Sequence, residues 1–262
     1  MIRLPLARSQ QPHFKVALIG SSFFLAAAST VAAQDKAPSA PAVISDQPAP
    51  SRGAMIAISP LRVELDGAGS AQTLRLANTG GTAVIVQTRI FAWTQNAVGD
   101  QYAPSTAVIA SPAVATIPPG QTQIIRLFRT SAVGNQEKAY RISIDQIPDA
   151  QSPEASAAKT RLRFLVPMFL DRARAMPTDL AWRQSNNGVE VSNRGGRTAR
   201  IAWIKLLDSA GQVVALENNS LRYIQSGYST AWSAPSLCRR NVTHALANID
   251  EVQVDVPLSP CN

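Results

Sequence analysis

TRLRFLVPMFL, at Thr160–Leu170, is the stretch from which the fold of this chain can be inferred, together with AYRISIDQIP at Ala139–Pro148 before it. The later stretch alternates with a period of two, which is typical of a β-strand. Its apolar face consists of Leu162, Phe164, Val166 and Met168. Arg161 and Arg163 fall on the opposite face, and Arg141 opens the earlier stretch. The two stretches therefore predict a hairpin whose strands carry arginines.

Arginines on neighbouring strands can bind a partner. A guanidinium group binds a carboxylate through two parallel charge-assisted hydrogen bonds. A strand beside such a group can hold the terminal carboxylate of another chain and pair with its backbone. Solvated arginines on an ordinary sandwich strand are the alternative, and the residues alone leave both interpretations open.

Around this hairpin the chain consists of short alternating runs that end at turn residues. About seven such runs lie between Met55 and Leu170, which predicts an immunoglobulin-like sandwich in a domain spanning residues 55–175. A second series follows Pro177 and predicts a smaller β domain over residues 176–262. One continuous barrel is the alternative, and the break at Pro177 speaks against it. The predicted fold class is all-β.

The N-terminus has the pattern of a secretory signal. Basic residues precede a short apolar core at Val16–Ala28, and small residues before Gln34 permit cleavage after Ala33. Residues 1–33 are therefore predicted to be a signal peptide, with an uncleaved anchor as the alternative. Residues 34–54 are rich in Pro and Ala and predict a disordered linker. We expect an exported protein that does not insert into a membrane.

Both cysteines, Cys238 and Cys261, belong to the second predicted domain. In an exported protein such a pair predicts a structural disulfide. Closing a loop of this size contributes about 3 kcal/mol by restricting the unfolded chain.

The composition argues against most catalytic chemistry. The chain holds two histidines and two cysteines, and it lacks the GxSxG and GxxxxGK motifs. The net charge of +8 and the 6% of aromatic residues are lower than expected for a nucleic-acid-binding surface. We therefore predict no catalytic residue, no metal, no cofactor and no nucleic-acid partner, and we expect a protein that is not an enzyme.

Six segments occur along the first domain in a fixed order. They are IAISPLRVEL (56–65), the Asn78-Thr79-Gly80 turn, IFAWTQ (90–95), VIASPAVATIPPGQTQIIRLF (108–128), YRISIDQIP (140–148) and TRLRFLVPMF (160–169). As an ordered set they resemble the PapD-like periplasmic pilus-assembly chaperones of the chaperone–usher pathway. The forms FAW, YRISIDQIP and RFLVPMF look most like the archaic, Csu-type branch.

The resemblance implies a fold and a function. It implies two immunoglobulin-like domains set at an angle with a cleft between them. It also implies a periplasmic chaperone, without enzymatic activity, that lends a strand to a pilin or fimbrial subunit. The chaperone would then deliver the subunit to an outer-membrane usher. A secreted adhesion or structural module with tandem immunoglobulin-like domains is the alternative, and it needs no basic cleft.

The resemblance also implies site residues. Two basic residues of the family anchor the subunit's C-terminal carboxylate, and Arg62 and Arg163 match their motifs here. Arg141, on the neighbouring strand, is a third candidate for the cleft. Large apolar residues that fill the subunit's groove are replaced by alanines in Ala155–Lys159, so either the donated face is shifted or the segment binds the groove weakly. The shifted face would consist of Leu162, Phe164 and Val166.

One further departure concerns the contact between the domains. Pro167 stands where the family has a basic residue of an inter-domain salt bridge. The sequence therefore predicts no such salt bridge from this strand.

Overall fold

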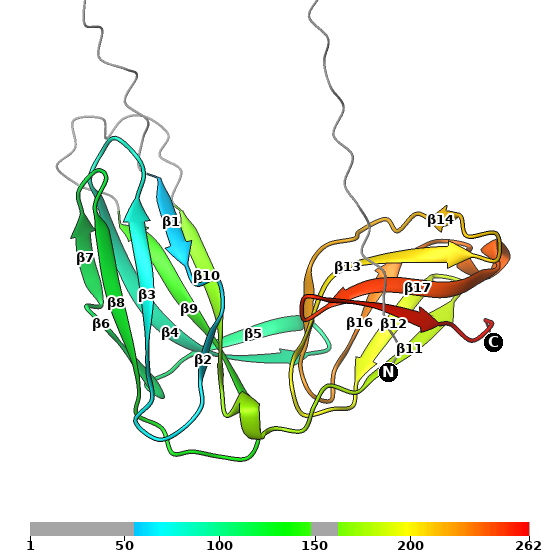
Figure 1. Ribbon diagram of the computed structural model, residues 1–262, viewed down its shortest axis with the longest axis horizontal. Coiled ribbons are helices and arrows are strands. Elements are labelled where there is room, and N and C mark those ends of the chain that lie inside the picture. The colour runs from blue at the N-terminus through cyan, green and yellow to red at the C-terminus, as the bar shows by residue number, and fades with distance from the viewer. Residues whose placement is uncertain (1–54, 148–161, 262) are drawn as a thin grey trace, which may run out of the picture. The chain divides into compact units, whose positions relative to one another are not determined.

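A computed structural model describes residues 55–147 and 162–261 of the chain. In these ranges the chain forms two β-sandwiches (Figure 1), which confirms the predicted all-β fold with two immunoglobulin-like domains. The helices of the described ranges are two short 3-10 turns, η1 (Arg172–Arg174) and η2 (Leu237–Arg240). No helix in this part of the chain is long and apolar enough to cross a membrane. The predicted signal peptide and linker lie outside the described residues.

The first domain packs two sheets face to face. One sheet has the order β1 (Ile56–Ser59), β3 (Ala71–Asn78), β8 (Thr122–Arg129), β6 (Val108–Ser111). The other has the order β2 (Val63–Leu65), β10 (Arg163–Leu170), β9 (Lys138–Ile147), β4 (Val84–Asn96), β5 (Gly99–Pro104), and β7 (Val114–Ile117) also pairs with β4. All neighbours are antiparallel except β2 and β10.

The predicted hairpin is formed by β9 and β10, which pair from Arg163 opposite Asp145 to Leu170 opposite Lys138. The alternation of β10 directs Val166, Met168 and Leu170 into the core of the first domain. Arginine and leucine side chains of β10 lie on the outer face of the same sheet. The connection between the two strands falls outside the described residues.

The N-terminal stretch Met55–Asp66 forms two strands that lie in different sheets. β1 pairs with β3, whereas β2 runs parallel to the end of β10. The chain changes sheets at Pro60 because proline cannot donate a backbone hydrogen bond to a ladder.

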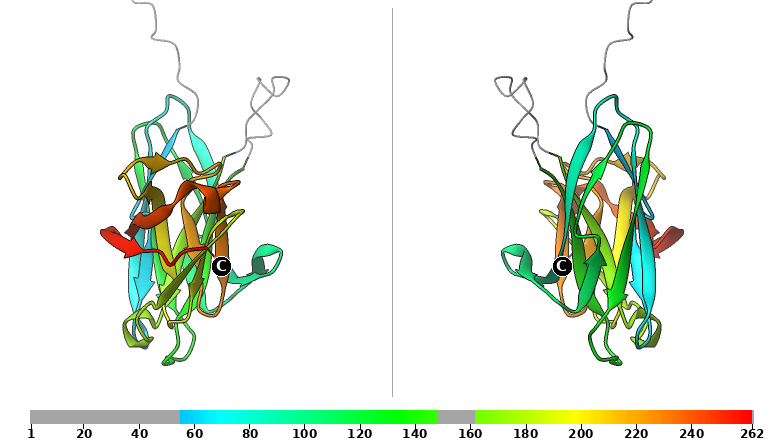
Figure 2. Two further views of the ribbon diagram at one scale, coloured as in Figure 1. Left: turned by 90° about the vertical axis from the view of Figure 1, so that its right-hand side faces the viewer. Right: turned by 90° about the vertical axis from the view of Figure 1, so that its left-hand side faces the viewer.

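One hairpin was not predicted. β4 continues past its pairing with β9, which ends at Ala92, and pairs with β5 from Phe91 to Asn96. All six residues of β5 are exposed. In both views of Figure 2 this hairpin (teal) projects from the body of the first sandwich. The β4–β5 hairpin therefore continues beyond the edge of the sheet from which β4 starts.

The second domain is also a two-layer sandwich. One sheet has the order β11 (Leu180–Ser185), β12 (Gly188–Asn193), β16 (Ser229–Ser233). The other has the order β14 (Val213–Val214), β13 (Ala199–Asp208), β17 (Val242–Ile249), β18 (Val252–Pro257), and β15 (Arg222–Ile224) also pairs with β13. Its core gathers around Trp232, Ile201 and Leu206.

The predicted disulfide is present between Cys238 and Cys261, whose Cα atoms are 5.6 Å apart. It joins the connection before β17 to the segment that follows β18. Replacing both cysteines with serine should lower the free energy of unfolding of the second domain by about 3 kcal/mol, because the unfolded chain regains the freedom of the loop. Urea unfolding of the variant and of the reduced wild type measures this loss, and an unchanged midpoint in both would contradict it.

Candidate functional site

Three aromatic rings meet where the first domain contacts the second. Trp93 on β4 lies 6.3 Å from Phe169 on β10 and 5.4 Å from Tyr223 on β15, measured between ring centroids. Trp93 and Phe169 are each 1% exposed. The rings are buried on what would otherwise be the outer face of the first domain's sheet, so contact with the second domain keeps them from water.

Two glutamines hold the strands that carry these rings. The side chain of Gln95 donates to the Tyr223 carbonyl at 2.9 Å and accepts from the Gln225 backbone N–H at 2.8 Å. In turn, the Gln225 side chain donates to the Trp93 carbonyl at 3.0 Å. Each glutamine thus satisfies backbone groups of the other domain, which positions β15 against the β4–β5 hairpin.

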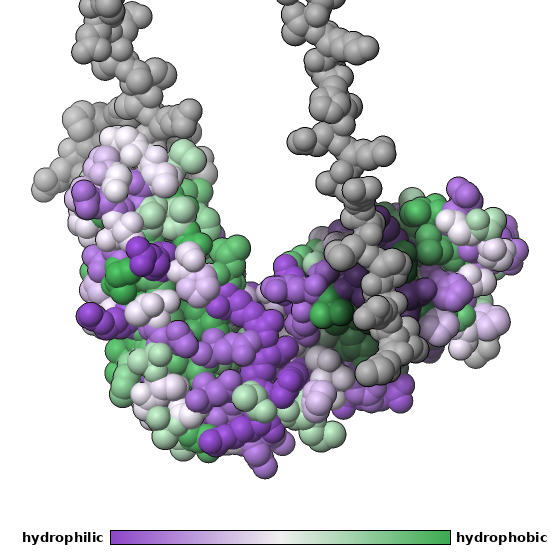
Figure 3. All heavy atoms as spheres, in the orientation of Figure 1, coloured by the Kyte–Doolittle hydropathy of each residue, from purple (hydrophilic) through white to green (hydrophobic). Residues whose placement is uncertain are grey.

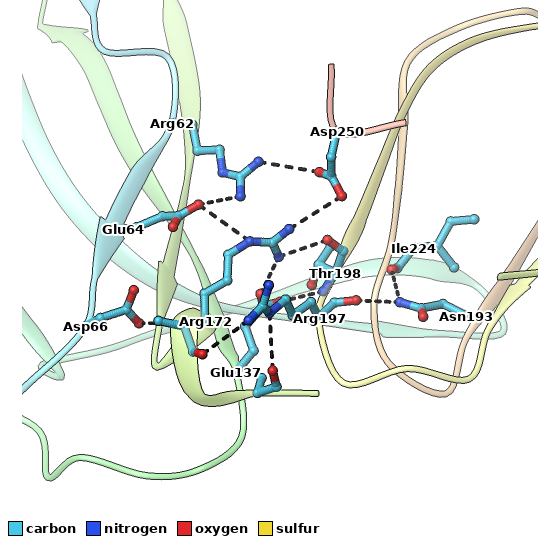
Figure 4. A network of polar contacts seen from close by, with 12 residues as sticks. Arg62, Glu64, Asp66, Glu137, Arg172, Asn193, Arg197, Thr198, Ile224 and Asp250 are labelled. Atoms are coloured by element: carbon cyan, nitrogen blue, oxygen red, sulfur yellow. Dashed lines mark hydrogen bonds and ion pairs between the residues drawn. The ribbon is translucent and has the colours of Figure 1, made fainter. Parts of the chain in front are cut away.

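A network of ion pairs also links the domains (Figure 4). Arg172 pairs with Glu137, and it lies 3.5 Å from both Glu64 and Asp250. Arg62 pairs with Glu64 and with Asp250. On the face shown in Figure 3, hydrophilic residues (purple) gather where the domains meet. The ion pairs between the domains are thus built from Arg62 and Arg172, which precede and follow the strands β2 and β10.

Arg141 lies in different surroundings. Its side chain leaves β9 on the outer face and stacks on Trp93, with 3.7 Å from the guanidinium carbon to the ring centroid. Tyr223 lies 4.9 Å from the same carbon. Arg141 is only 8% exposed, and within the described part of the chain it has no ion-pair partner and its Nε has no hydrogen bond. It is therefore a largely buried cation that no carboxylate of these residues neutralises.

Arg141 borders a hollow of about 580 Å³ that both domains line. The β4–β5 hairpin, Leu165 and Pro167 of β10, and residues 220–223 and 228–230 of the second domain complete its wall. Among the lining residues Asp100 is the one acid, and it already accepts from Gln95 and from Tyr102, at 2.9 and 3.0 Å. A cationic hollow of this kind favours an anionic group of a partner.

The phenol of Tyr102 adds to this wall. Burial, together with the negative charge of Asp100, raises the pKa of Tyr102. The Tyr102 hydroxyl donates to Asp100 at 3.0 Å.

Comparison with known proteins identifies the first domain. Residues 55–171 match the sequence profile of the PapD N-terminal domain of pili and flagellar-assembly chaperones. The match covers the first domain and no part of the second. A comparison of the whole sequence with curated proteins finds no match.

Solved structures of pilus chaperones share the two-domain fold. A chain of the CsuC–CsuE complex, a chaperone with a tip adhesion subunit from archaic Csu pili of Acinetobacter baumannii, aligns with a TM-score of 0.58 at 19% identity, over 79% of this chain and all of that one. The E. coli chaperone DraB aligns with a TM-score of 0.58 at 15% identity, over 79% and 97%. The Pseudomonas aeruginosa CupB2 chaperone gives 0.57 at 17% identity, over 78% and 100%. At these identities the likeness shows the fold.

The two arginines matched by motif both lie along β10. The guanidinium carbon of Arg62 lies 5.3 Å from the ring centroid of Phe169. The register of β2 against β10 sets Val63 opposite Met168, so Arg62 comes next to Pro167. Arg163 stands four positions before Pro167, a separation of about 13 Å along the strand at the usual rise. The pairing of Arg62 with Arg163 at one anchor stays a prediction.

Both of these arginines also have acidic partners. Arg62 faces Glu64 and Asp250, and Arg163, whose side chain is 62% exposed, pairs with Asp145. Burial would raise the pKa of Asp145, but hydrogen bonds from Arg89, Arg163 and Ser143 outweigh it and lower that pKa. Of the three arginines that the sequence singled out, Arg141 alone lacks a carboxylate partner among the described residues.

The predicted donated face has mixed surroundings. Val166 is buried in the core at 4% exposure, and Phe164 packs against the same core. Leu162 lies just before β10, is half-buried, and its carbonyl accepts from the Gln146 N–H at 3.0 Å. Donation of these three side chains to a partner stays a prediction. The alanine-rich segment Ala155–Lys159 lies outside the described residues.

No cluster of three or more His, Cys, Asp or Glu side chains able to hold a metal ion occurs in residues 55–147 and 162–261.

Proposed function

We propose that this chain is a periplasmic chaperone that binds pilin or fimbrial subunits by strand addition and delivers them to an outer-membrane usher. The family of its first domain supports the chaperone role. Solved relatives of the same fold include a chaperone bound to a tip adhesion subunit and the Salmonella enterica chaperone SafB bound to the pilin SafA. The disulfide agrees with an oxidising compartment such as the periplasm. Pilus chaperones are not enzymes, and likewise no catalytic residue is predicted from the sequence.

An open strand edge supports strand addition. β2 pairs with β10 only from Met168 to Leu170, so the first half of β10 has no described strand on that side. The Gln146 N–H donates to the Leu162 carbonyl, so Leu162 and Gln146 form a hydrogen-bonded pair of the antiparallel ladder. In such a ladder every second residue of β10 bonds to β9, and the residues between them direct their backbone groups to the other side. By that alternation Arg163 and Leu165 direct their backbone N–H and C=O groups to the open edge. A partner strand can take up these groups because an unpaired edge is a template for pairing.

The open edge leads to the hollow at Arg141. Leu165 and Pro167, the next outward residues of β10, line that hollow together with Arg141. A strand added along β10 can therefore place its terminal carboxylate beside the buried, unpaired guanidinium of Arg141. This juxtaposition of an open strand edge with an unneutralised cation is the observation that carries the proposal.

Arg141→Gln tests the anchor. The chaperone is co-expressed in the periplasm with a pilin subunit encoded beside it, and the ratio of bound to unbound subunit is measured. We expect this ratio to fall by about tenfold or more, because a charge-assisted hydrogen bond to the terminal carboxylate is lost. Arg141→Lys keeps the charge without the planar fork and should retain part of the binding.

Arg126→Gln is the matched control, since Arg126 is an exposed arginine of β8 in the other sheet of the same domain. It should leave the ratio unchanged. An unchanged thermal midpoint of Arg141→Gln shows that the variant is folded. Wild-type capture by folded Arg141→Gln would reject the anchor, and absence of capture by the wild type would favour the tandem structural module.

A further inference from the structure

The hollow at Arg141 has a second arginine in its wall, contributed by the other domain. Arg222 opens β15, directly before the Tyr223 that Gln95 holds. Its Nη1 donates to the Thr230 hydroxyl at 3.1 Å, and its guanidinium carbon lies 5.3 Å from the ring centroid of Trp232. Its Nε is buried and has no hydrogen-bond partner among the described residues. Neither the sequence patterns nor the family resemblance singled out this residue.

The charges of the hollow do not balance. Arg141 and Arg222 both line it, and neither forms an ion pair within the described part of the chain. Asp100, the one acid of the wall, is already bonded by Gln95 and Tyr102. Partly buried cations without a counter-ion lose hydration without gaining attraction, which favours binding of an anion between them.

We infer that Arg222 is the second cation of the anchor, so that the terminal carboxylate of the subunit is bound by one arginine from each domain. The inference rests on the proposed function and adds the second domain to its binding site. A carboxylate offers two oxygens with separate lone pairs, so two guanidinium groups can each donate to it. The hydroxyls of Ser220 and Thr230, which share the wall, can complete its hydrogen bonds, whereas the Ser229 hydroxyl already donates to Glu190 at 2.9 Å.

The junction contacts explain how Arg222 is positioned. β15 is only three residues long and pairs with β13 over Ala199–Ile201. The bonds from Gln95 to Tyr223 and Gln225 fix its other side. Arg222 is thus an anchoring residue whose place in the hollow depends on contact between the domains.

The test combines Arg222→Gln with a change in the subunit. The co-expressed pilin is used as it is and with two glycines added at its C-terminus, which moves the carboxylate out of register. With wild-type chaperone, the extension should lower the bound-to-unbound ratio by about tenfold. Arg222→Gln should lower the ratio for the native subunit by a similar factor. Because Arg141 still binds the carboxylate in Arg222→Gln, the extension should lower the ratio of this variant further, but by a smaller factor than for the wild type.

The outcomes separate the two proposals. If the extension lowers the ratio by the same factor with wild type and with Arg222→Gln, Arg222 does not bind the carboxylate, while the anchor at Arg141 stands. If the extension has no effect on the wild type, carboxylate anchoring itself is wrong. Arg240→Gln changes an exposed arginine of η2 outside the hollow and should respond to the extension as the wild type does. Unchanged thermal midpoints show that the variants are folded.

Discussion

Asp171→Asn is expected to lower the free energy of unfolding by about 3–5 kcal/mol, because it leaves a buried guanidinium without its counter-ion. Both Asp171 oxygens accept from Arg129 at 2.8 Å, and both side chains are 0% exposed. Asp171 also accepts from the Gly134 N–H at 3.0 Å. Asparagine is the sharpest replacement, since it keeps the shape and tolerates the backbone φ of 59° at this position. Urea unfolding at neutral pH measures the loss.

The pH dependence tests the cause of this loss. The hydrogen bonds from Arg129 lower the pKa of Asp171 in the folded protein. The stability that this carboxylate contributes is therefore complete above its unfolded pKa of about 3.9 and is lost as the pH falls through the folded value. The difference between wild type and Asp171→Asn should shrink on acidification. A difference that stays constant down to that range would contradict the ion-pair explanation.

Asp255→Ala is the control for this prediction. Asp255 lies exposed on β18 and has no ion pair in the described residues. Replacing such a surface acid should change the free energy of unfolding by less than about 0.5 kcal/mol.

Glu137→Gln is expected to lower stability by about 2–4 kcal/mol and to loosen the contact between the domains. The Glu137 side chain is 3% exposed; one oxygen pairs with Arg172, and the other accepts from the Thr198 N–H of the second domain at 2.7 Å. Glutamine can still accept from Thr198, and Arg172 keeps the Thr198 carbonyl at 3.0 Å and the carboxylates of Glu64 and Asp250, each at 3.5 Å. The cost is therefore smaller than for a cation that loses every partner.

Calorimetry measures this second prediction. If Glu137 couples the domains, the variant should unfold in two separated transitions, and the first-domain transition can be followed by the fluorescence of Trp93 at the junction. Glu251→Gln, at an exposed turn before β18, is the matched control and should unfold as the wild type does. A Glu137→Gln variant with wild-type transitions would show that the other ion pairs suffice.

Much of the fold follows from local pattern. The alternation at Phe164, Val166 and Met168 places β10 in the core, and turn residues separate the strands of two successive sandwiches. Period-two patterning is a property of neighbouring residues, so a single sequence carries it. The hairpin of β4 and β5 was missed because its exposed residues lack that alternation.

The residues of the candidate site could not be predicted from local sequence patterns. Motif matching selected Arg62 and Arg163, but each meets a carboxylate that folding brings from elsewhere, Asp250 in the first case and Asp145 in the second. Likewise, the sequence does not show that Val166 is buried in the core and that Phe164 packs against it. A residue's type and spacing do not reveal which charges surround it.

The sequence alone determined the strand pattern, the two domains, the cysteine pair and the arginine-bearing hairpin. Each of these features depends on short-range periodicity or on residue type. Which arginine is free to bind a partner depended on the folded chain. Arg141 is stacked on Trp93 and lines, together with Arg222, a hollow built from both domains, and these residues are far apart in the chain. Charge compensation is a property of three-dimensional neighbours, and only packing brings those neighbours together.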